Sequence, residues 1–223
     1  MLPPTSHRDL KNQLFGQVAR IGKVVAHPKR LELIELLSQG EKDVELLARA
    51  TDISVKLTSA HLKELRIARV VIAQRAGKHQ IYRLASESVA DLWVTLRVLA
   101  EQQLPDLRAA LEQLPGSPDD TTALDGPTLW QQAQQGEVAL LDVRPTSEFA
   151  AAHLPHAYSI PLDELPQRLD ELPRTLPVVT YCRGPFCLMA QEGVEILRAA
   201  GFAAHRLELG VAEWRAEGLP LSR

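Results

Sequence analysis

Apolar residues recur at every third or fourth position through the first part of the chain, which is the period of an α-helix. The recurrence predicts one helix over residues 10–25 and a second that begins at Pro28, because proline suits the first helical position. Asp43 and Ser54 each precede a further apolar stretch and can cap a short helix there. Two short helices in succession predict a helix-turn-helix.

Strand-like runs follow at residues 70–75 and 80–84, and the connection between them contains Gly77. Such a pair predicts a β-hairpin, which would form a wing beside the helix-turn-helix. A leucine-rich helical pattern then runs over residues 89–114, with a kink expected at Pro105. This helix is longer than a small winged domain can cover, so its apolar face needs a further partner.

Residues 115–122 are loop formers, and the helical periodicity stops there. Beyond them strands and helices alternate, which indicates an α/β sheet. The predicted strands are 138–143 and 178–181, and the predicted helical segments are 129–135, turns near Glu148 and Leu165, and 188–200. We expect two domains, an α-dominated winged helix-turn-helix of α+β type and an α/β domain with a parallel sheet. Their predicted bounds are 1–114 and 125–223, with a linker at 115–124.

Charge divides the chain in the same way. Residues 1–114 hold 17 Lys and Arg against 13 Asp and Glu, a net charge of +4, whereas residues 115–223 hold 8 against 15, a net charge of −7. Between residues 54 and 83 the basic residues oppose only Glu64. Such a run indicates a site for a polyanion, and a solvated basic face is the alternative.

The cysteine content and the hydropathy indicate the compartment. The first ten residues hold no apolar run typical of a signal peptide, and nowhere do about 18 apolar residues follow one another, so we expect a cytoplasmic protein. Cys182 and Cys187 are the only cysteines and lie in one short loop. In a reducing compartment such a pair suggests reactivity rather than a disulfide framework.

The N-terminal part resembles the arsenical-repressor (ArsR) family of winged-helix regulators. The resemblance rests on HPKRLELIELL from residue 27, SAHLKEL from residue 59 and the wing sequence RAGKHQIYRL from residue 75. It implies a homodimer, joined through its first and last helices, that inserts residues 54–68 into the major groove of double-stranded operator DNA. The residues expected to face DNA as exposed side chains are Lys56, Thr58, Ser59, His61 and Lys63, and at the wing Arg75, Lys78 and His79. For His61, helix packing is the alternative.

Metal-sensing relatives often carry a cysteine pair after the Gly-Glu element, which is Gly40-Glu41 here. This chain instead reads Lys42-Asp43-Val44-Glu45, and residues 1–114 contain no cysteine. Thiolate coordination of a soft metal by the DNA-binding domain is therefore excluded.

The C-terminal part resembles the rhodanese domain across residues 125–223. The resemblance rests on LLDVRPTSEFAAAHLPHAYSIPLDEL, VVTYCRGPFC and ELGVAEWRAEGLPL, which begin at residues 140, 178 and 208. Asp142 and Arg144, with Glu148, resemble the family's buried structural ion pair and turn. Ala152 and His156 stand where relatives usually have glycine.

Cys182 is the expected nucleophile of that domain. It lies between a strand and a helix, so loop N–H groups, the helix dipole and the neighbouring Arg183 should lower its pKa. A persulfide on Cys182 is the chemistry that this predicts, and a buried inert cysteine is the alternative. Cys187 closes the loop, either as a resolving cysteine that attacks the modified Cys182 or as a small packing residue.

Two functional classes follow from the fusion. The leading hypothesis is a transcriptional regulator in which sulfane sulfur or a related thiophile modifies Cys182 and so alters DNA affinity through the leucine-rich helix. The alternative is a sulfurtransferase that moves sulfur from thiosulfate or a persulfide to a thiol acceptor and regulates its own operon. A phosphatase or arsenate reductase is rejected, because Leu188 stands where a basic residue would close the loop. We expect no cofactor, and no zinc site from the scattered His153, His156 and His205.

Overall fold

The computed structural model describes residues 6–223, with Pro118 described by its backbone alone. The chain forms two compact units that divide between Ala90 and Asp91, and each is described here by itself. The division falls inside helix α5 (Glu87–Gln103), so most of α5 belongs to the second unit. None of the helices in this described part is long and apolar enough to cross a membrane.

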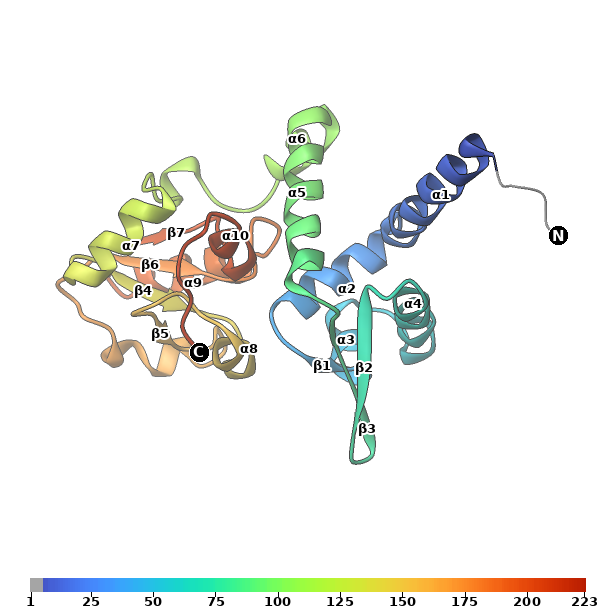
Figure 1. Ribbon diagram of the computed structural model, residues 1–223. Helices are drawn as coiled ribbons and strands as arrows, with labels where there is room; N and C mark the ends of the chain where they lie inside the picture. Colours follow the sequence, from blue (N-terminus) through green and yellow to red (C-terminus); the bar gives the residue numbers. More distant parts are fainter. Residues whose placement is uncertain (1–5) are drawn as a thin grey trace. The chain divides into compact units, whose positions relative to one another are not determined.

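Four helices precede the β-hairpin in the first unit (Figure 1). They are α1 (His7–Val25), α2 (Pro28–Ser38), α3 (Val44–Ala50) and α4 (Val55–Ile67). The predicted caps form, because Asp43 accepts a hydrogen bond from the backbone N–H of Leu46 and Ser54 accepts one from that of Leu57. Their side chains therefore fix where α3 and α4 begin.

The wing is a three-stranded antiparallel sheet in the order β1-β3-β2. Its strands are β1 (Lys42–Asp43), β2 (Val71–Ala76) and β3 (His79–Leu84). Gly77 and Lys78 alone connect β2 to β3, and Gly77 has a positive φ of 61°, which glycine adopts without steric cost. Strand β1 has only two residues, too few to show an alternating pattern, which is why the sequence did not predict it.

The second unit is built on a four-stranded parallel sheet in the order β5-β4-β6-β7. Its strands are β4 (Ala139–Asp142), β5 (Tyr158–Ser159), β6 (Val178–Tyr181) and β7 (Ala204–Arg206). Its helices are α7 (Gly126–Gln135), α8 (Thr146–Ala151), α9 (Met189–Ala199) and α10 (Val211–Ala216), with short 3-10 turns at Pro118–Asp120, Leu165–Gln167 and Leu169–Glu171. The predicted fold class, a winged helix-turn-helix followed by a parallel α/β domain, is confirmed.

Alternate residues of β4 enter two separate cores. Leu141 packs with residues of α9, whereas Leu140 packs with residues of α7 and α10. Because successive strand residues point to opposite faces of a sheet, α9 covers one face and α7 and α10 cover the other. The loop that follows β6 therefore lies where a strand end meets the start of α9.

The leucine-rich stretch forms two helices rather than one kinked helix. Helix α5 ends at Gln103 and α6 (Pro105–Leu111) begins after Leu104, whose ψ of 103° is extended. The ring of Pro105 disfavours helical geometry at the residue before it, so the helix stops there.

The segment expected to link the domains is bound to the second unit. Asp120 accepts hydrogen bonds from the backbone N–H of Ser117 and the side chain of Gln191, and forms an ion pair with Arg198 of α9. Thr121 bridges to Arg206 of β7 as a parallel neighbour. Residues 117–122 are thus attached to the edge of the sheet through one bridge at Thr121, although their composition is that of a loop.

Candidate functional site

The loop from Cys182 to Cys187 joins β6 to α9. Cys182 has 2 % of its surface exposed, and its Sγ donates to the backbone carbonyl of Cys187 at 3.4 Å. Backbone N–H groups of Ala190 and Gly184 are directed at the same sulfur. The loop therefore curls around Cys182 as the strand–loop–helix pattern predicts.

The expected lowering of the Cys182 pKa is wrong in direction. Burial raises the pKa of the Cys182 thiol well above its ordinary value, and the neighbouring Cys187 adds to the effect. Desolvation penalises a thiolate at this depth more than the loop N–H groups favour it. Burial at this position therefore opposes ionisation of Cys182.

The pKa of Cys187 shifts in the opposite direction. Its pKa is lowered to about 6, first by the hydrogen bond from the Cys182 side chain and then by the backbone N–H groups of Arg183 and Met189, against the opposing effect of burial. Cys187 is also the more exposed of the two sulfurs. The pKa values of the two hydrogen-bonded thiols therefore shift in opposite directions, upward at Cys182 and downward at Cys187.

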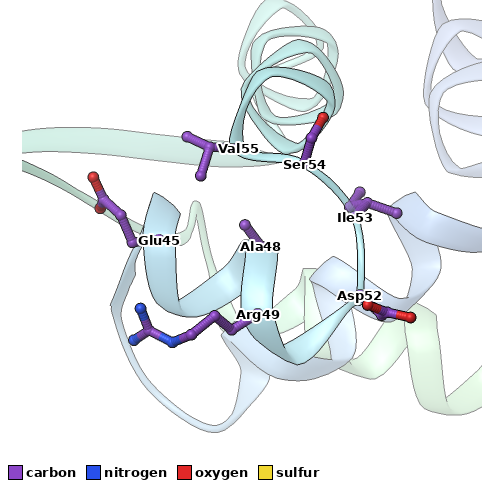
Figure 2. Close-up of a pocket in the computed structure, with 7 residues that line it drawn as sticks. All are labelled: Glu45, Ala48, Arg49, Asp52, Ile53, Ser54 and Val55. Atoms are coloured by element: carbon purple, nitrogen blue, oxygen red, sulfur yellow. The ribbon is translucent and has the colours of Figure 1, made fainter.

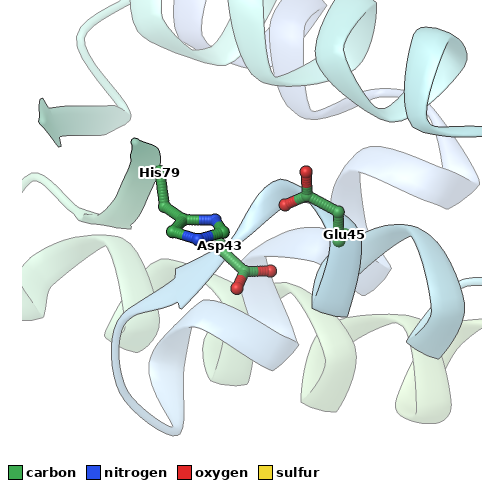
Figure 3. Close-up of side chains that lie close together, drawn as sticks. All are labelled: Asp43, Glu45 and His79. Carbon is green, nitrogen blue, oxygen red and sulfur yellow. The ribbon is translucent and has the colours of Figure 1, made fainter. Parts of the chain in front are cut away.

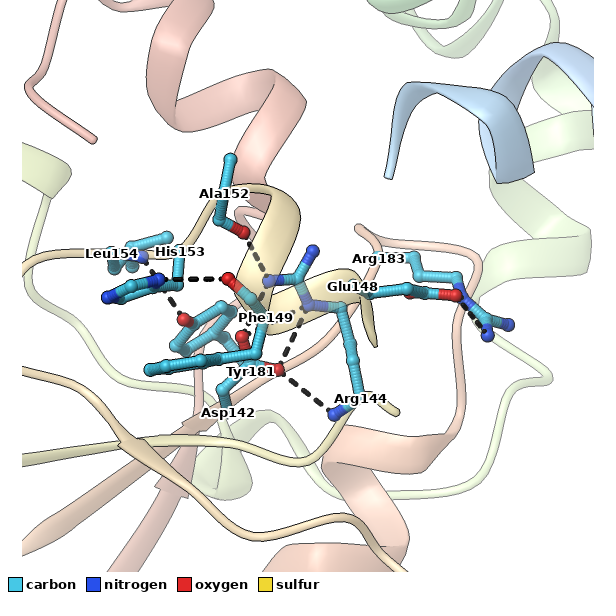
Figure 4. A network of polar contacts seen from close by, with 9 residues as sticks. All are labelled: Asp142, Arg144, Glu148, Phe149, Ala152, His153, Leu154, Tyr181 and Arg183. Atoms are coloured by element: carbon cyan, nitrogen blue, oxygen red, sulfur yellow. Dashed lines mark hydrogen bonds and ion pairs between the residues drawn. The ribbon is translucent and has the colours of Figure 1, made fainter. Parts of the chain in front are cut away.

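Arg183 has a partner that sequence reasoning missed. Its guanidinium binds the carboxylate of Glu148 on α8, with Nη2–Oε1 at 2.9 Å and Nε–Oε2 at 3.0 Å (Figure 4). Glu148 is only 2 % exposed. A buried charge requires a counter-charge, and the only signal for this pairing was that both residues stand in the motifs of one domain.

Asp142 and Arg144 form a fully buried ion pair at the end of β4. Arg144 Nη2 lies 2.6 Å from Asp142 Oδ2 and also donates to the carbonyl of Ala152 at 2.9 Å. The guanidinium carbon lies 5.6 Å from the ring centre of Tyr181 in β6 (Figure 4). The pair thereby ties the loop after α8 to the two central strands.

A second carboxylate lies against the outside of the cysteine loop. Glu213 of α10 is 4 % exposed and accepts from the backbone N–H of Gly210 at 3.0 Å. A Cβ on Gly184 would come within 3.1 Å of the Glu213 oxygens, and one on Gly210 within 2.5 Å of the Arg183 carbonyl. Gly184 also has a φ of 139°, so both positions require glycine for conformation or close packing.

Helix α5 contacts the same loop from residue 91 onward. Trp93 meets the Phe186 ring edge-on with 6.0 Å between the ring centres, and Arg97 stands 5.9 Å from that ring. Arg97 is 6 % exposed and pairs with Glu101 at 2.5 Å and Glu213 at 3.3 Å. Burial raises the pKa of Glu213, and Arg97 opposes that rise. The leucine-rich stretch thus contacts the cysteine loop through Trp93 and Arg97, while its Leu92, Leu99 and Leu104 stay exposed.

The expected DNA-facing residues of α4 include both exposed and buried side chains. Lys56, Ser59 and Lys63 are exposed, as a contact surface requires. Thr58 is fully buried, and its hydroxyl donates to the Ser54 carbonyl at 3.0 Å. The prediction that Thr58 is exposed is wrong, because position 58 falls on the face of α4 that packs inward with Leu62.

His61 has a partner across the first unit. Its ring lies 4.5 Å from that of His27, the cap of α2, and it is half-buried. Burial lowers the pKa of His61, and His27 and Arg30 lower it further. His61 therefore contributes no strong positive charge to the surface of α4.

The wing residues Arg75, Lys78 and His79 are all exposed. His79, however, lies beside Asp43 and Glu45, with possible ligand atoms of the three within 4.8 Å of one another (Figure 3). Two carboxylates beside an imidazole make His79 less suited to a phosphate than Arg75 or Lys78.

An open hollow of about 470 Å³ lies between α3 and the start of α4 (Figure 2). Its lining includes Glu45, Asp52 and Arg49, charges of both signs. The mixed charge distinguishes this hollow from the basic surface of α4.

Family comparisons match both parts of the chain. The model described as "Bacterial regulatory protein, arsR family" matches residues 27–73, and the rhodanese-like domain model matches residues 127–217.

Individual proteins resemble either nearly the whole chain or one of its two parts. An HTH-type transcriptional regulator, Rv0324 of Mycobacterium tuberculosis, is 43 % identical over 213 residues, which cover 96 % of this chain and 93 % of that protein. A sulfurtransferase of Allochromatium vinosum is 30 % identical over 100 residues, or 44 % of this chain and 92 % of that protein. The homodimeric winged helix-turn-helix domain Mb0332 of Mycobacterium bovis, known in solution, is 40 % identical with a TM-score of 0.42, over 47 % of this chain and 95 % of that one.

Proposed function

Because this chain belongs to the arsR family of bacterial transcriptional regulators and carries a rhodanese-like domain, we propose that its affinity for operator DNA changes when sulfane sulfur reacts with the cysteine loop. The packing of α5 against that loop carries the proposal. Trp93 and Arg97 contact Phe186, which stands immediately before Cys187. A change at the sulfur therefore meets a helix that continues N-terminally into the first unit.

The sulfur chemistry uses both cysteines. The thiolate of Cys187 attacks a sulfane sulfur and forms a Cys187 persulfide, releasing the remainder of the donor as a thiolate. The thiol of Cys182 then attacks the Cys187 sulfur, a Cys182–Cys187 disulfide forms, and hydrogen sulfide leaves with the second proton. Both thiols are oxidised and the sulfane sulfur is reduced, so no other oxidant is needed. The likeness to a protein named sulfurtransferase supports the first step.

The order of attack differs from the one expected from sequence, in which Cys182 carries the persulfide. We assign the first step to Cys187 because it is the more exposed sulfur and its pKa is about 6. Cys182 is buried and protonated, which suits the second step.

DNA binding is assigned to the exposed lysines of α4 and the cations of the wing. Lys56 and Lys63 lie seven residues apart on exposed positions of α4, which is about two helical turns. Arg75 lies near the end of β2, and Lys78 lies in the hairpin connection. We place DNA binding and dimerisation in residues 1–114 and sulfur chemistry in residues 125–223. A row of exposed apolar residues on α1 supports a homodimer: Leu10 50 %, Leu14 60 %, Phe15 66 % and Val18 71 % exposed.

A mobility-shift assay with the full chain tests the proposal. Operator fragments are selected with the reduced protein from random DNA and then titrated before and after treatment with sodium polysulfide. We expect the dissociation constant to change by about fivefold or more, the usual range of coupling between two sites. Cys187→Ser should abolish the response, whereas Arg168→Gln, which removes a guanidinium paired with Glu164 and Glu171, should not. The proposal would be refuted if wild-type protein that contains the Cys182–Cys187 disulfide bound DNA with an unchanged dissociation constant.

A further inference from the structure

The charges around the cysteine loop point to a particular class of sulfur donor. Two guanidinium groups lie at the loop, those of Arg183 and Arg97, and both are committed to carboxylates. Arg183 binds Glu148 through three contacts of 2.9 to 3.2 Å. Arg97 lies between Glu101 and Glu213. Glu148 also interacts with Arg144, which pairs with Asp142, so four carboxylates face three cations before the thiolate of Cys187 is counted.

The unit that contains the loop also has an excess of negative charge. Residues 91–223 contain 10 Arg and no Lys against 19 Asp and Glu, a net charge of −9. The accessible side of the loop also carries apolar groups, since Phe186 packs on Trp93 and the half-buried Met189 packs on the core beside Cys187. A doubly charged anion would approach a negative thiolate through a negative field and past aromatic rings.

We infer that the loop accepts sulfane sulfur from uncharged or singly charged carriers, such as organic trisulfides and hydropersulfides, and discriminates against dianionic donors such as thiosulfate. This inference rests on the proposed function, because it specifies the donor for the same cysteine pair. The backbone N–H groups of the loop still stabilise the thiolate and the leaving sulfur, so the discrimination comes from the side-chain charges. Glu148 and Glu213 are its determinants.

An organic trisulfide gives a balanced reaction. The Cys187 thiolate attacks the central sulfur, a mixed trisulfide forms, and an alkyl thiolate leaves and takes up a proton from water. Cys182 then attacks the sulfur of Cys187, gives up its proton, and expels an alkyl hydropersulfide. Two protein thiols are oxidised to one disulfide, and the trisulfide is reduced to one thiol and one hydropersulfide.

The test compares dimethyl trisulfide, which is uncharged, with thiosulfate on the full-length reduced protein. Modification of Cys182 and Cys187 is followed by intact-mass and peptide mass spectrometry at low and high salt. We expect the thiosulfate rate to rise severalfold between about 20 and 200 mM salt, because screening weakens the repulsion, and the trisulfide rate to stay constant. A thiosulfate rate that falls with salt would overturn the inference.

Charge variants supply a second measurement that does not depend on the intrinsic reactivity of each donor. Glu148→Gln and, separately, Glu213→Gln should raise the ratio of the thiosulfate rate to the trisulfide rate by about tenfold, since each frees a guanidinium at the loop. Asp170→Asn, at a fully exposed carboxylate, is the control and should leave the ratio unchanged. An unchanged ratio in a folded variant at both loop positions would refute the assignment. Modification by thiosulfate alone would refute the donor class but leave the proposed function standing, whereas modification by neither donor would overturn both.

Discussion

At the scale of single residues, the pKa values of the two thiols of the loop shift in opposite directions. Alkylation of the wild-type protein by iodoacetamide should occur first at Cys187, with a rate that rises with pH and is half-maximal near pH 6. The rate falls below that pH because the thiolate, the reactive form, becomes protonated. Peptide mapping after brief labelling across a pH series measures both the site and the midpoint.

Two variants at position 182 separate the causes of this low pKa. Cys182→Ala removes the hydrogen bond that contributes most to it, so the midpoint should move up toward the ordinary cysteine value of about 8.5. Cys182→Ser keeps a hydroxyl donor and should move the midpoint less. Earlier labelling of Cys182 in the wild type would show that the charge lies on the other sulfur.

His156 stands at a position where its backbone is strained. Its φ is +65°, in the left-handed region that glycine tolerates and other residues rarely occupy, and relatives usually have glycine there. His156→Gly should therefore raise the free energy of unfolding by about 0.5–1 kcal/mol, after the greater chain entropy of glycine is allowed for. Denaturant unfolding measures it. His156→Ala retains the strain and should give no gain, so equal effects of the two changes would argue against strain.

At the scale of elements, α5 is the helix through which we propose that sulfur chemistry alters DNA binding. Phe186→Ala removes the ring that meets Trp93 and Arg97, but leaves both cysteines. We expect this variant to form the Cys182–Cys187 bridge and to lose most of the accompanying change in DNA affinity. Mass spectrometry and mobility shift on the same sample measure the two effects together.

The conservative change Phe186→Tyr keeps the ring and should respond as the wild type does. If Phe186→Ala responds fully, the signal passes elsewhere, and the segment at 117–122, held by Asp120 and Arg198, is the next candidate.

At the scale of the whole molecule, DNA affinity should depend steeply on salt, because the first half of the chain carries the basic surface. Lys56→Ala and Lys63→Ala should each weaken binding and reduce the slope of log affinity against log salt by about one per protomer. Thr58→Ala should leave the slope unchanged, since Thr58 is buried. Fluorescence anisotropy at several salt concentrations measures the slopes. Equal slopes for wild type and both lysine variants would contradict the assigned surface.

Features set by neighbouring residues were predictable from the sequence. The caps at Asp43 and Ser54 and the turn at Gly77 depend on a few adjacent positions, and each lies where the pattern indicated. At Pro105 the expected kink is instead a break between two helices. The position of the cysteine loop was also predictable, because the strand before it and the helix after it were both expected from the sequence.

Features that depend on tertiary neighbours were not predictable. The pairing of Arg183 with Glu148 joins residues 35 positions apart, and the packing of Arg97 on Glu213 joins residues 116 apart. The opposite pKa shifts of the two cysteines depend on their burial in the folded loop, which the sequence does not show. The same holds for Thr58, because helical periodicity alone did not identify the packed face of so short a helix.

The attachment of residues 117–122 to the sheet also protects the protein against aggregation. β7 is an outer strand, and outer strands present unpaired N–H and carbonyl groups to other chains. Here Thr121 pairs with Arg206, and the N–H of Thr122 donates to the Arg206 carbonyl at 2.8 Å. Residues 117–122 are synthesised before β7. They are therefore present to cover part of the β7 edge as soon as that strand forms.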